Sequence, residues 1–153
     1  MIHSNNQNKG YTLIELMVVL GIIALLLGIS INGLINLIQW SKLNRAAALL
    51  GSQLKNAQSQ AFYEGVYYKI DFWESLDRYR IYKQTELAEE ITLKDIDLFN
   101  TNFTDDNVYF YPSGVPGQGG TVTLKNNQGK FLYVIMTPVT AKVRISTEPP
   151  ENW

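Results

Sequence analysis

Residues 10–27 read GYTLIELMVVLGIIALLL, and this stretch decides how the rest of the chain is organised. The residues from Leu16 to Ile38 are apolar with few exceptions. As a helix they would extend about 35 Å at about 1.5 Å per residue, enough to cross a hydrocarbon core of about 30 Å. A buried core helix is the alternative, but so long an apolar run with one charge near its start is unusual in a soluble domain. We therefore expect one membrane span over about residues 13–38.

Glu15 is the single carboxylate near the start of this apolar segment. At the edge of a membrane span an unpaired carboxylate is costly, which makes it a functional candidate. The competing interpretation is that Glu15 lies at headgroup depth and favours the positive end of the helix dipole. Cleavage after Gly10 would favour the first interpretation. Tyr11 would then carry a free α-amine four residues before Glu15, so a cation and a carboxylate would meet at the head of an apolar helix.

The segment before the apolar run, residues 1–10, is polar and carries Lys9 as its one fixed charge. A secretory signal peptide has its apolar region before a small residue at the cleavage site, whereas here Gly10 precedes the apolar region. The order is reversed, so we expect a cleavable leader of a different kind. Charge does not settle the orientation of the span, because Lys42 and Arg45 beyond one end oppose Lys9 before the other.

The sequence Gly10-Tyr11-Thr12-Leu13-Ile14-Glu15, followed by the apolar run, resembles the N-terminus of type IV prepilins, with Tyr11 in place of the common Phe. The resemblance implies that a membrane prepilin peptidase cuts between Gly10 and Tyr11 on the cytoplasmic side and methylates the new N-terminus at Tyr11. It also implies that Glu15 neutralises the terminal amine of a neighbouring subunit in a filament core. Such a buried ion pair can select subunit register, because removing one partner is costly.

The resemblance further implies a location and a set of partners. The leader would lie in the cytoplasm, the span in the inner (cytoplasmic) membrane and the C-terminal domain outside, before the subunit enters an extracytoplasmic filament. The implied partners are prepilin peptidase, other pilin or pseudopilin subunits, membrane lipid, the membrane protein of the assembly platform and, indirectly, its ATPase.

Beyond the span, the periodicity changes to that of an amphipathic helix and then to that of strands. Apolar residues recur at helical spacing up to Ala61, so we predict one helix over 11–64, ending at Gly65, whose second half lies against the following domain. Residues 65–153 alternate as strands, with Leu87–Asp106 read only as strand fragments and loop. The expected fold is α+β, a long N-terminal helix packed on an antiparallel β-sheet domain.

The last strand was predicted at Lys142 to Ser146, with Val143 and Ile145 alternating with its polar residues. Together with the Phe110–Gly114 and Gly120–Leu124 segments, it is similar to the C-terminal sheet of minor pseudopilins of the GspH/FimT type and of competence pseudopilins. DNA-binding members of that group carry a Gly-Arg-x-Arg pattern in the last strand, where this chain has Ala-Lys-Val-Arg. Lys142 and Arg144 are therefore candidate DNA contacts, although two cations are few for non-specific DNA binding.

The sequence offers few residues that could form a catalytic or metal site. The chain has no cysteine, and its one histidine is His3, in the expected leader, so a cysteine nucleophile and His-based catalysis are both excluded from a processed chain. Asp95 with Asp97, and Asp105 with Asp106, lack the spacing of an EF-hand and are expected to be solvated loop acids. We expect no enzyme activity, no metal site and no cofactor.

The function expected from the sequence is that of a structural subunit, a minor pilin or pseudopilin, in a type IV pilus-like filament. The sequence identifies the class but not the system, so type II secretion, pilus assembly and competence are left as alternatives. A net charge of -1 gives no general attraction to nucleic acid or anionic lipid. The alternative from another class is a membrane-tethered module that binds DNA or a secreted substrate. A signal-anchored enzyme is disfavoured by the missing site chemistry.

Overall fold

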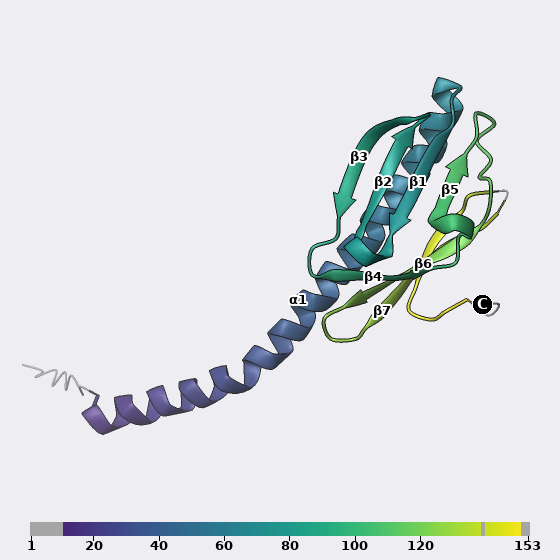
Figure 1. Ribbon diagram of the computed structural model, residues 1–153. Helices are drawn as coiled ribbons and strands as arrows, with labels where there is room; N and C mark the ends of the chain where they lie inside the picture. The colour runs from purple at the N-terminus through teal and green to yellow at the C-terminus, as the bar shows by residue number, and fades with distance from the viewer. Residues whose placement is uncertain (1–10, 139, 151–153) are drawn as a thin grey trace, which may run out of the picture. The chain divides into compact units, whose positions relative to one another are not determined.

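The computed structural model describes residues 11–138 and 140–150 (Figure 1). Its residues fall into two compact units, one up to Leu37 and one from Ile38 onward. A single helix, α1 (Leu13–Glu64), supplies the first unit and continues into the second. The prediction of one uninterrupted helix is confirmed. The helix ends at Gly65, whose φ of 68° is the left-handed conformation that commonly closes a helix.

In the first unit, the side chains of α1 over residues 13–28 and 33–37 are exposed. Within an 18-residue window of mean hydropathy 2.7, none of the side chains is buried, and the helix is long and apolar enough to cross a membrane. In the second unit, α1 has one buried stripe and an exposed polar face. The buried stripe consists of Leu43, Ala47, Leu50, Leu54, Ala57 and Ala61. These are positions that the helical periodicity predicted to pack on the domain.

The strands of the second unit form two four-stranded antiparallel sheets. The first sheet has the order β3-β2-β1-β5 and contains β1 (Tyr68–Trp73), β2 (Arg78–Lys83), β3 (Glu86–Thr92) and β5 (Asn107–Phe110). The second has the order β4-β6-β7-β8 and contains β4 (Ile96–Thr101), β6 (Gly120–Asn126), β7 (Phe131–Met136) and β8 (Val143–Ser146). The α+β antiparallel class predicted from the sequence is confirmed.

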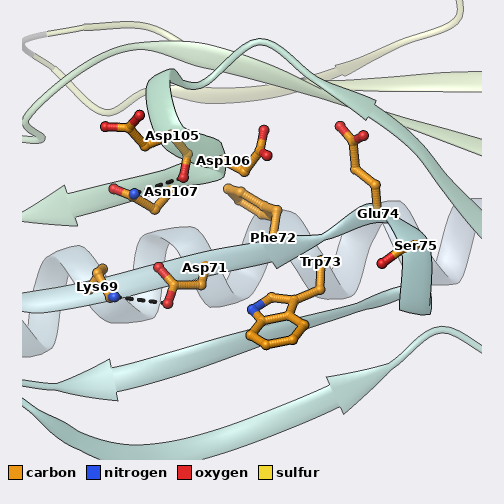
Figure 2. A pocket seen from close by; sticks show the side chains of 9 residues that line it. All are labelled: Lys69, Asp71, Phe72, Trp73, Glu74, Ser75, Asp105, Asp106 and Asn107. Atoms are coloured by element: carbon orange, nitrogen blue, oxygen red, sulfur yellow. Dashed lines mark hydrogen bonds and ion pairs between the residues drawn. The ribbon is translucent and has the colours of Figure 1, made fainter.

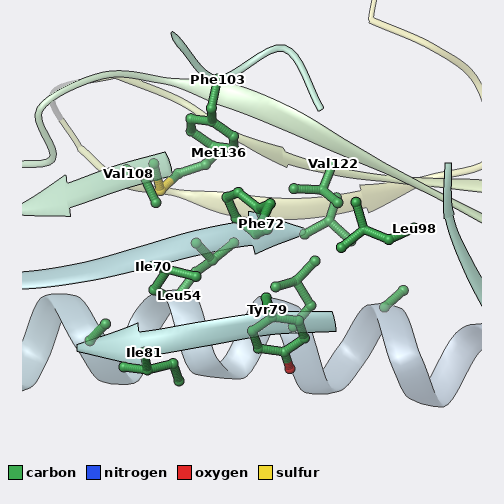
Figure 3. Packing of buried hydrophobic residues seen from close by; sticks show 14 of the residues in the cluster. Leu54, Ile70, Phe72, Tyr79, Ile81, Leu98, Phe103, Val108, Val122 and Met136 are labelled. Atoms are coloured by element: carbon green, nitrogen blue, oxygen red, sulfur yellow. The ribbon is translucent and has the colours of Figure 1, made fainter. Parts of the chain in front are cut away.

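One hydrophobic core joins the second half of α1 to both sheets (Figure 3). Figure 3 labels Leu54 of α1, together with Ile70, Phe72, Tyr79, Ile81, Leu98, Phe103, Val108, Val122 and Met136. All of these side chains are buried. Phe72 and Phe103 stack at a centroid distance of 5.4 Å, which connects β1 to the segment before β5. The second half of α1 is therefore part of the core of the β-rich unit.

Two ion pairs fix which turns lie at each end of the helix in this unit. Glu64 pairs with Lys83 at 2.6 Å, which places the β2–β3 turn beside the C-terminal end of α1. Lys42 pairs with Asp95 at 2.6 Å, which places the β3–β4 turn beside the N-terminal part of α1 in this unit. Figure 1 shows the same arrangement, with β3 running between the two ends.

The segment Leu87–Asp106, read from the sequence only as strand fragments and loop, contains all of β4 and all of β3 except its first residue, Glu86. β3 is an edge strand with almost no buried side chain, so burial imposes no alternation on its sequence. β4 has an irregularity between Leu98 and Asn100, which interrupts its period of two. These two features explain why the sequence of this segment shows no clear strand periodicity.

The predicted last strand differs from the structure at its start and in its pattern. β8 begins at Val143, and Lys142 lies in the preceding turn, where its carbonyl accepts the N–H of Thr137. Ile145 is 44% exposed and Arg144 is exposed as well, so the alternation of apolar and polar residues in this strand does not correspond to an alternation of buried and exposed side chains. β8 pairs with β7 alone and forms the sheet edge, where a side chain needs no buried face.

Asp77 connects the two sheets. It lies between η1 (Glu74–Leu76) and β2 with a φ of 46°, and its Oδ1 accepts the backbone N–H of Leu98 in β4 at 2.9 Å. We predict that Asp77→Ala lowers the free energy of unfolding by about 1–3 kcal/mol, because it leaves that donor unpaired.

The matched control is Asp77→Asn, because Asn tolerates the left-handed conformation and retains an acceptor oxygen. Asp77→Asn should lower the free energy of unfolding by clearly less than Asp77→Ala does. Denaturant unfolding of the full chain in detergent, followed by circular dichroism, measures both. Equal losses for the two variants would contradict the assigned hydrogen bond.

Candidate assembly site

The start of α1 is built around a reciprocal pair of contacts between Thr12 and Glu15. The Oγ1 of Thr12 accepts the backbone N–H of Glu15 at 3.2 Å, and the Oε2 of Glu15 accepts the backbone N–H of Thr12 at 3.5 Å. Leu16 donates its N–H to the carbonyl of Thr12, at 3.2 Å, and so begins the helical hydrogen-bond series. This is a capping box, in which the two side chains satisfy backbone donors that a helix start leaves unpaired.

The capping box holds the Glu15 carboxylate at the positive end of the helix, where a negative charge is favourable. Tyr11 precedes the cap and is 90% exposed. Tyr11, Thr12 and Glu15 line one hollow together with apolar residues of the first turns of α1. Gly10, the predicted residue before the cleavage point, lies outside the described residues. The structure thus places Tyr11 and Glu15 on one surface at the head of the apolar helix.

Thr12 is the residue of this site whose role the sequence reasoning did not assign. The signal was present, because Thr-x-x-Glu directly before an apolar run is a capping-box signature. This role gives Glu15 a local function within the single chain, which must be separated from any function between subunits.

Asp105 and Asp106 lie with Asp71 and Glu74 around a hollow beside β1, with Trp73 at one side (Figure 2). Figure 2 shows the carboxylates pointing in different directions. Asp71 pairs with Lys69 at 2.8 Å, and Glu74 accepts the N–H of Thr101 at 2.7 Å. Among residues 11–138 and 140–150, no cluster of three or more metal-ligating side chains is found.

Asp95 and Asp97 have separate environments. The Lys42 ammonium lowers the pKa of Asp95 through their hydrogen bond. Partial burial raises the pKa of Asp97, and the nearby Asp77 raises it further. The two carboxylates therefore belong to different local networks.

Lys142 and Arg144, the candidate DNA contacts, are both exposed. Lys142 lies in the turn before β8 and Arg144 within β8, opposite Ile135 of β7. Their role in DNA binding stays a prediction.

Residues 5–31 match the family model described as the prokaryotic N-terminal methylation motif. The chain carries the N-terminal motif of type IV prepilins. The match covers residues 5–10, the capping box and the first part of the apolar helix. No curated protein matches the sequence.

Solved structures extend the likeness of this prepilin-like chain to its β-rich unit. The minor pseudopilin EpsH of the type 2 secretion system of Vibrio cholerae is similar with a TM-score of 0.57 at 11% identity, over 69% of this chain and 96% of EpsH. The type IV minor pilin FimU of Pseudomonas aeruginosa, in one crystal form, is similar with a TM-score of 0.57 at 12% identity, over 71% of this chain and 98% of FimU. At these identities the likeness establishes the fold, which is that of minor pilins and pseudopilins.

Proposed function

We propose that this chain is a minor pilin or pseudopilin, which prepilin peptidase cleaves between Gly10 and Tyr11 and methylates at Tyr11, and which then enters a type IV pilus-like filament. The observation that carries the proposal is the joint presence of the methylation motif over residues 5–31 and the minor-pilin fold. Neither feature depends on the other, since the motif lies in the N-terminal segment and the fold in the β-rich unit.

The geometry of the helix start supports a role for Glu15 in this assembly. After cleavage, the α-amine of Tyr11 would lie one residue before the Thr12 N–H that Glu15 contacts. The carboxylate has four acceptor positions in all, so the capping contact leaves it capacity for a cation. A neighbouring subunit's terminal amine is such a cation. We propose that Glu15 neutralises it when apolar helices pack together away from water.

The apolar half of α1 would hold the chain in the cytoplasmic membrane before assembly. Its exposed apolar side chains and its length support a span over about residues 13–38. The leader of residues 1–10 would face the cytoplasm, where the peptidase acts, and the β-rich unit would face outward. In the filament, the same apolar surface would pack against the helices of other subunits.

Assembly is tested by expressing the full chain with a prepilin peptidase and a complete type IV pilus or type II secretion assembly system, and then isolating sheared filaments. The proposal predicts that the processed chain is present in the filament fraction at a low ratio to a major subunit. A processed chain that stays wholly in the membrane fraction of every such system would overturn the assembly role.

A further inference from the structure

The β-rich unit carries an aromatic and basic surface that the assembly site does not use. We call it the aromatic end patch, and it consists of Trp40, Phe99, Lys125, Lys130, Phe131 and Tyr133. Trp40, Lys130, Phe131 and Tyr133 line a groove of about 510 Å³ beside the β6–β7 turn. This volume is within the range of about 300–1,000 Å³ that is typical of pockets for small ligands.

The patch is continuous through ring contacts. Phe131 meets Phe99 edge to face at a centroid distance of 5.3 Å, and the Nζ of Lys125 lies 5.0 Å from the Phe99 ring centroid and 5.7 Å from that of Phe131. Phe99 is 50% exposed and Trp40 is 36% exposed. Burying the exposed part of these aromatic residues would be favourable, because apolar area removed from water contributes roughly 25 cal/mol per Å².

The patch lies at one end of the unit, beside the first turns of α1 that belong to it. Trp40 is two residues beyond Ile38, where the apolar segment ends. At about 1.5 Å per residue, Trp40 follows the end of that segment by about 3 Å along the helix axis. Tryptophan and tyrosine favour the membrane–water interface, where an apolar ring can be buried while its polar atom stays hydrated.

The charges of the patch suit an anionic surface. Lys125 and Lys130 are its charged members, and no carboxylate of the residues that the structure describes lines the groove. Asp97 of β4 is the register partner of Lys125. The chain has a net charge of -1, so an attraction to anionic lipid has to be local, as it is here.

We propose that the aromatic end patch docks on the headgroups of anionic phospholipids in the membrane that holds the apolar helix. This inference rests on the proposed function, because it requires the segment before Trp40 to be inserted in that membrane. Docking would hold the β-rich unit against the membrane before assembly. It would be lost when the subunit leaves the bilayer for the filament.

The absence of cysteine from the chain makes a single-site probe straightforward. The full-length Asn127→Cys variant, in the β6–β7 turn, and the control Thr85→Cys variant, in the β2–β3 turn at the other end, are labelled with the fluorophore bimane and reconstituted into vesicles. The vesicles contain phosphatidylcholine alone or an equimolar mixture with phosphatidylglycerol, and carry lipids with a nitroxide near the headgroup. The proposal predicts strong quenching at position 127 in the mixed vesicles, weaker quenching in phosphatidylcholine, and little at position 85.

Charge variants test the chemistry of the contact. Lys125→Gln and Lys130→Gln should each lower the ratio of docked to undocked unit about fivefold in the mixed vesicles, because a basic side chain near an anionic surface contributes about 1 kcal/mol. Lys55→Gln, which removes the same charge from the exposed face of α1, should leave the ratio of docked to undocked unit unchanged. Raising the salt concentration should weaken docking, because salt screens exposed charges.

Three outcomes would overturn the inference. Resistance of the chain to alkaline extraction reports whether the helix is inserted, and a chain that is extracted would contradict the proposed function as well. An inserted chain with equal quenching at positions 127 and 85 would contradict the lipid contact alone. Quenching at position 127 that follows the protein-to-lipid ratio and ignores lipid charge would assign the patch to a second copy of the chain.

Discussion

Glu15→Ala is expected to remove the chain from filaments while leaving it cleaved and methylated. In the proposed filament, removing one partner of an ion pair buried between subunits would leave the other charge uncompensated, at a cost of about 3–5 kcal/mol, or more than about a hundredfold in an equilibrium. The measurement is the amount of the variant in the sheared filament fraction, relative to the amount in membranes.

The capping box supplies the control, because Glu15 also contacts Thr12 within its own chain. A capping box accepts Gln in place of Glu, so Glu15→Gln keeps the helix start and removes the charge. Glu15→Gln should therefore fail to assemble as Glu15→Ala does, while Thr12→Ala, which weakens the cap and keeps the charge, should assemble. Normal incorporation of Glu15→Gln would show that Glu15 acts only as a cap.

Leu50→Ala is expected to produce the largest loss of stability among the single changes considered. Leu50 has no exposed surface and belongs to the core between α1 and the sheets. Truncating such a buried leucine typically costs about 2–5 kcal/mol, since the transfer free energy of the lost atoms adds to that of the cavity left behind. Denaturant unfolding of the full chain in detergent, followed by the circular dichroism of the β-rich unit, measures this loss.

The neighbouring residue provides a matched control, because Leu49→Ala changes the composition and the helix propensity of α1 in the same way as Leu50→Ala. Leu49 is 43% exposed, whereas Leu50 has no exposed surface. Leu49→Ala should lower the free energy of unfolding by much less than Leu50→Ala does. Similar losses at the two positions would contradict the packing of the second half of α1 on the sheets.

The helix was predictable from the sequence because its two halves have simple and strong patterns. The apolar run up to Ile38 and the buried positions from Leu43 to Ala61 both follow from helical spacing, and Gly65 ends the helix as expected. The central strands β1 and β2 were also legible, since one face of each is buried and the other faces solvent.

The rest depends on the sheet edges and on side-chain geometry, which the sequence pattern does not report. β3 and β8 are edge strands, so the pairing of the backbone determines them more than alternation does. At the candidate site, the motif pointed to Glu15, and the Thr-x-x-Glu pattern also carried the signal of a capping box, although the role of Thr12 was assigned only from the structure. The aromatic end patch could not be predicted from the sequence either, because Trp40 and Phe131 are far apart in the chain and meet only at one groove of the fold.

The intact mass of the chain isolated from membranes decides whether it is a processed prepilin. The chain is expressed with and without a prepilin peptidase and measured by mass spectrometry. For a processed prepilin we expect that, with the peptidase, the mass falls by that of residues 1–10 and rises by one methyl group at Tyr11. An unchanged mass beside a control prepilin that the same peptidase cleaves would contradict it, and residues 10–15 would then head an ordinary membrane anchor.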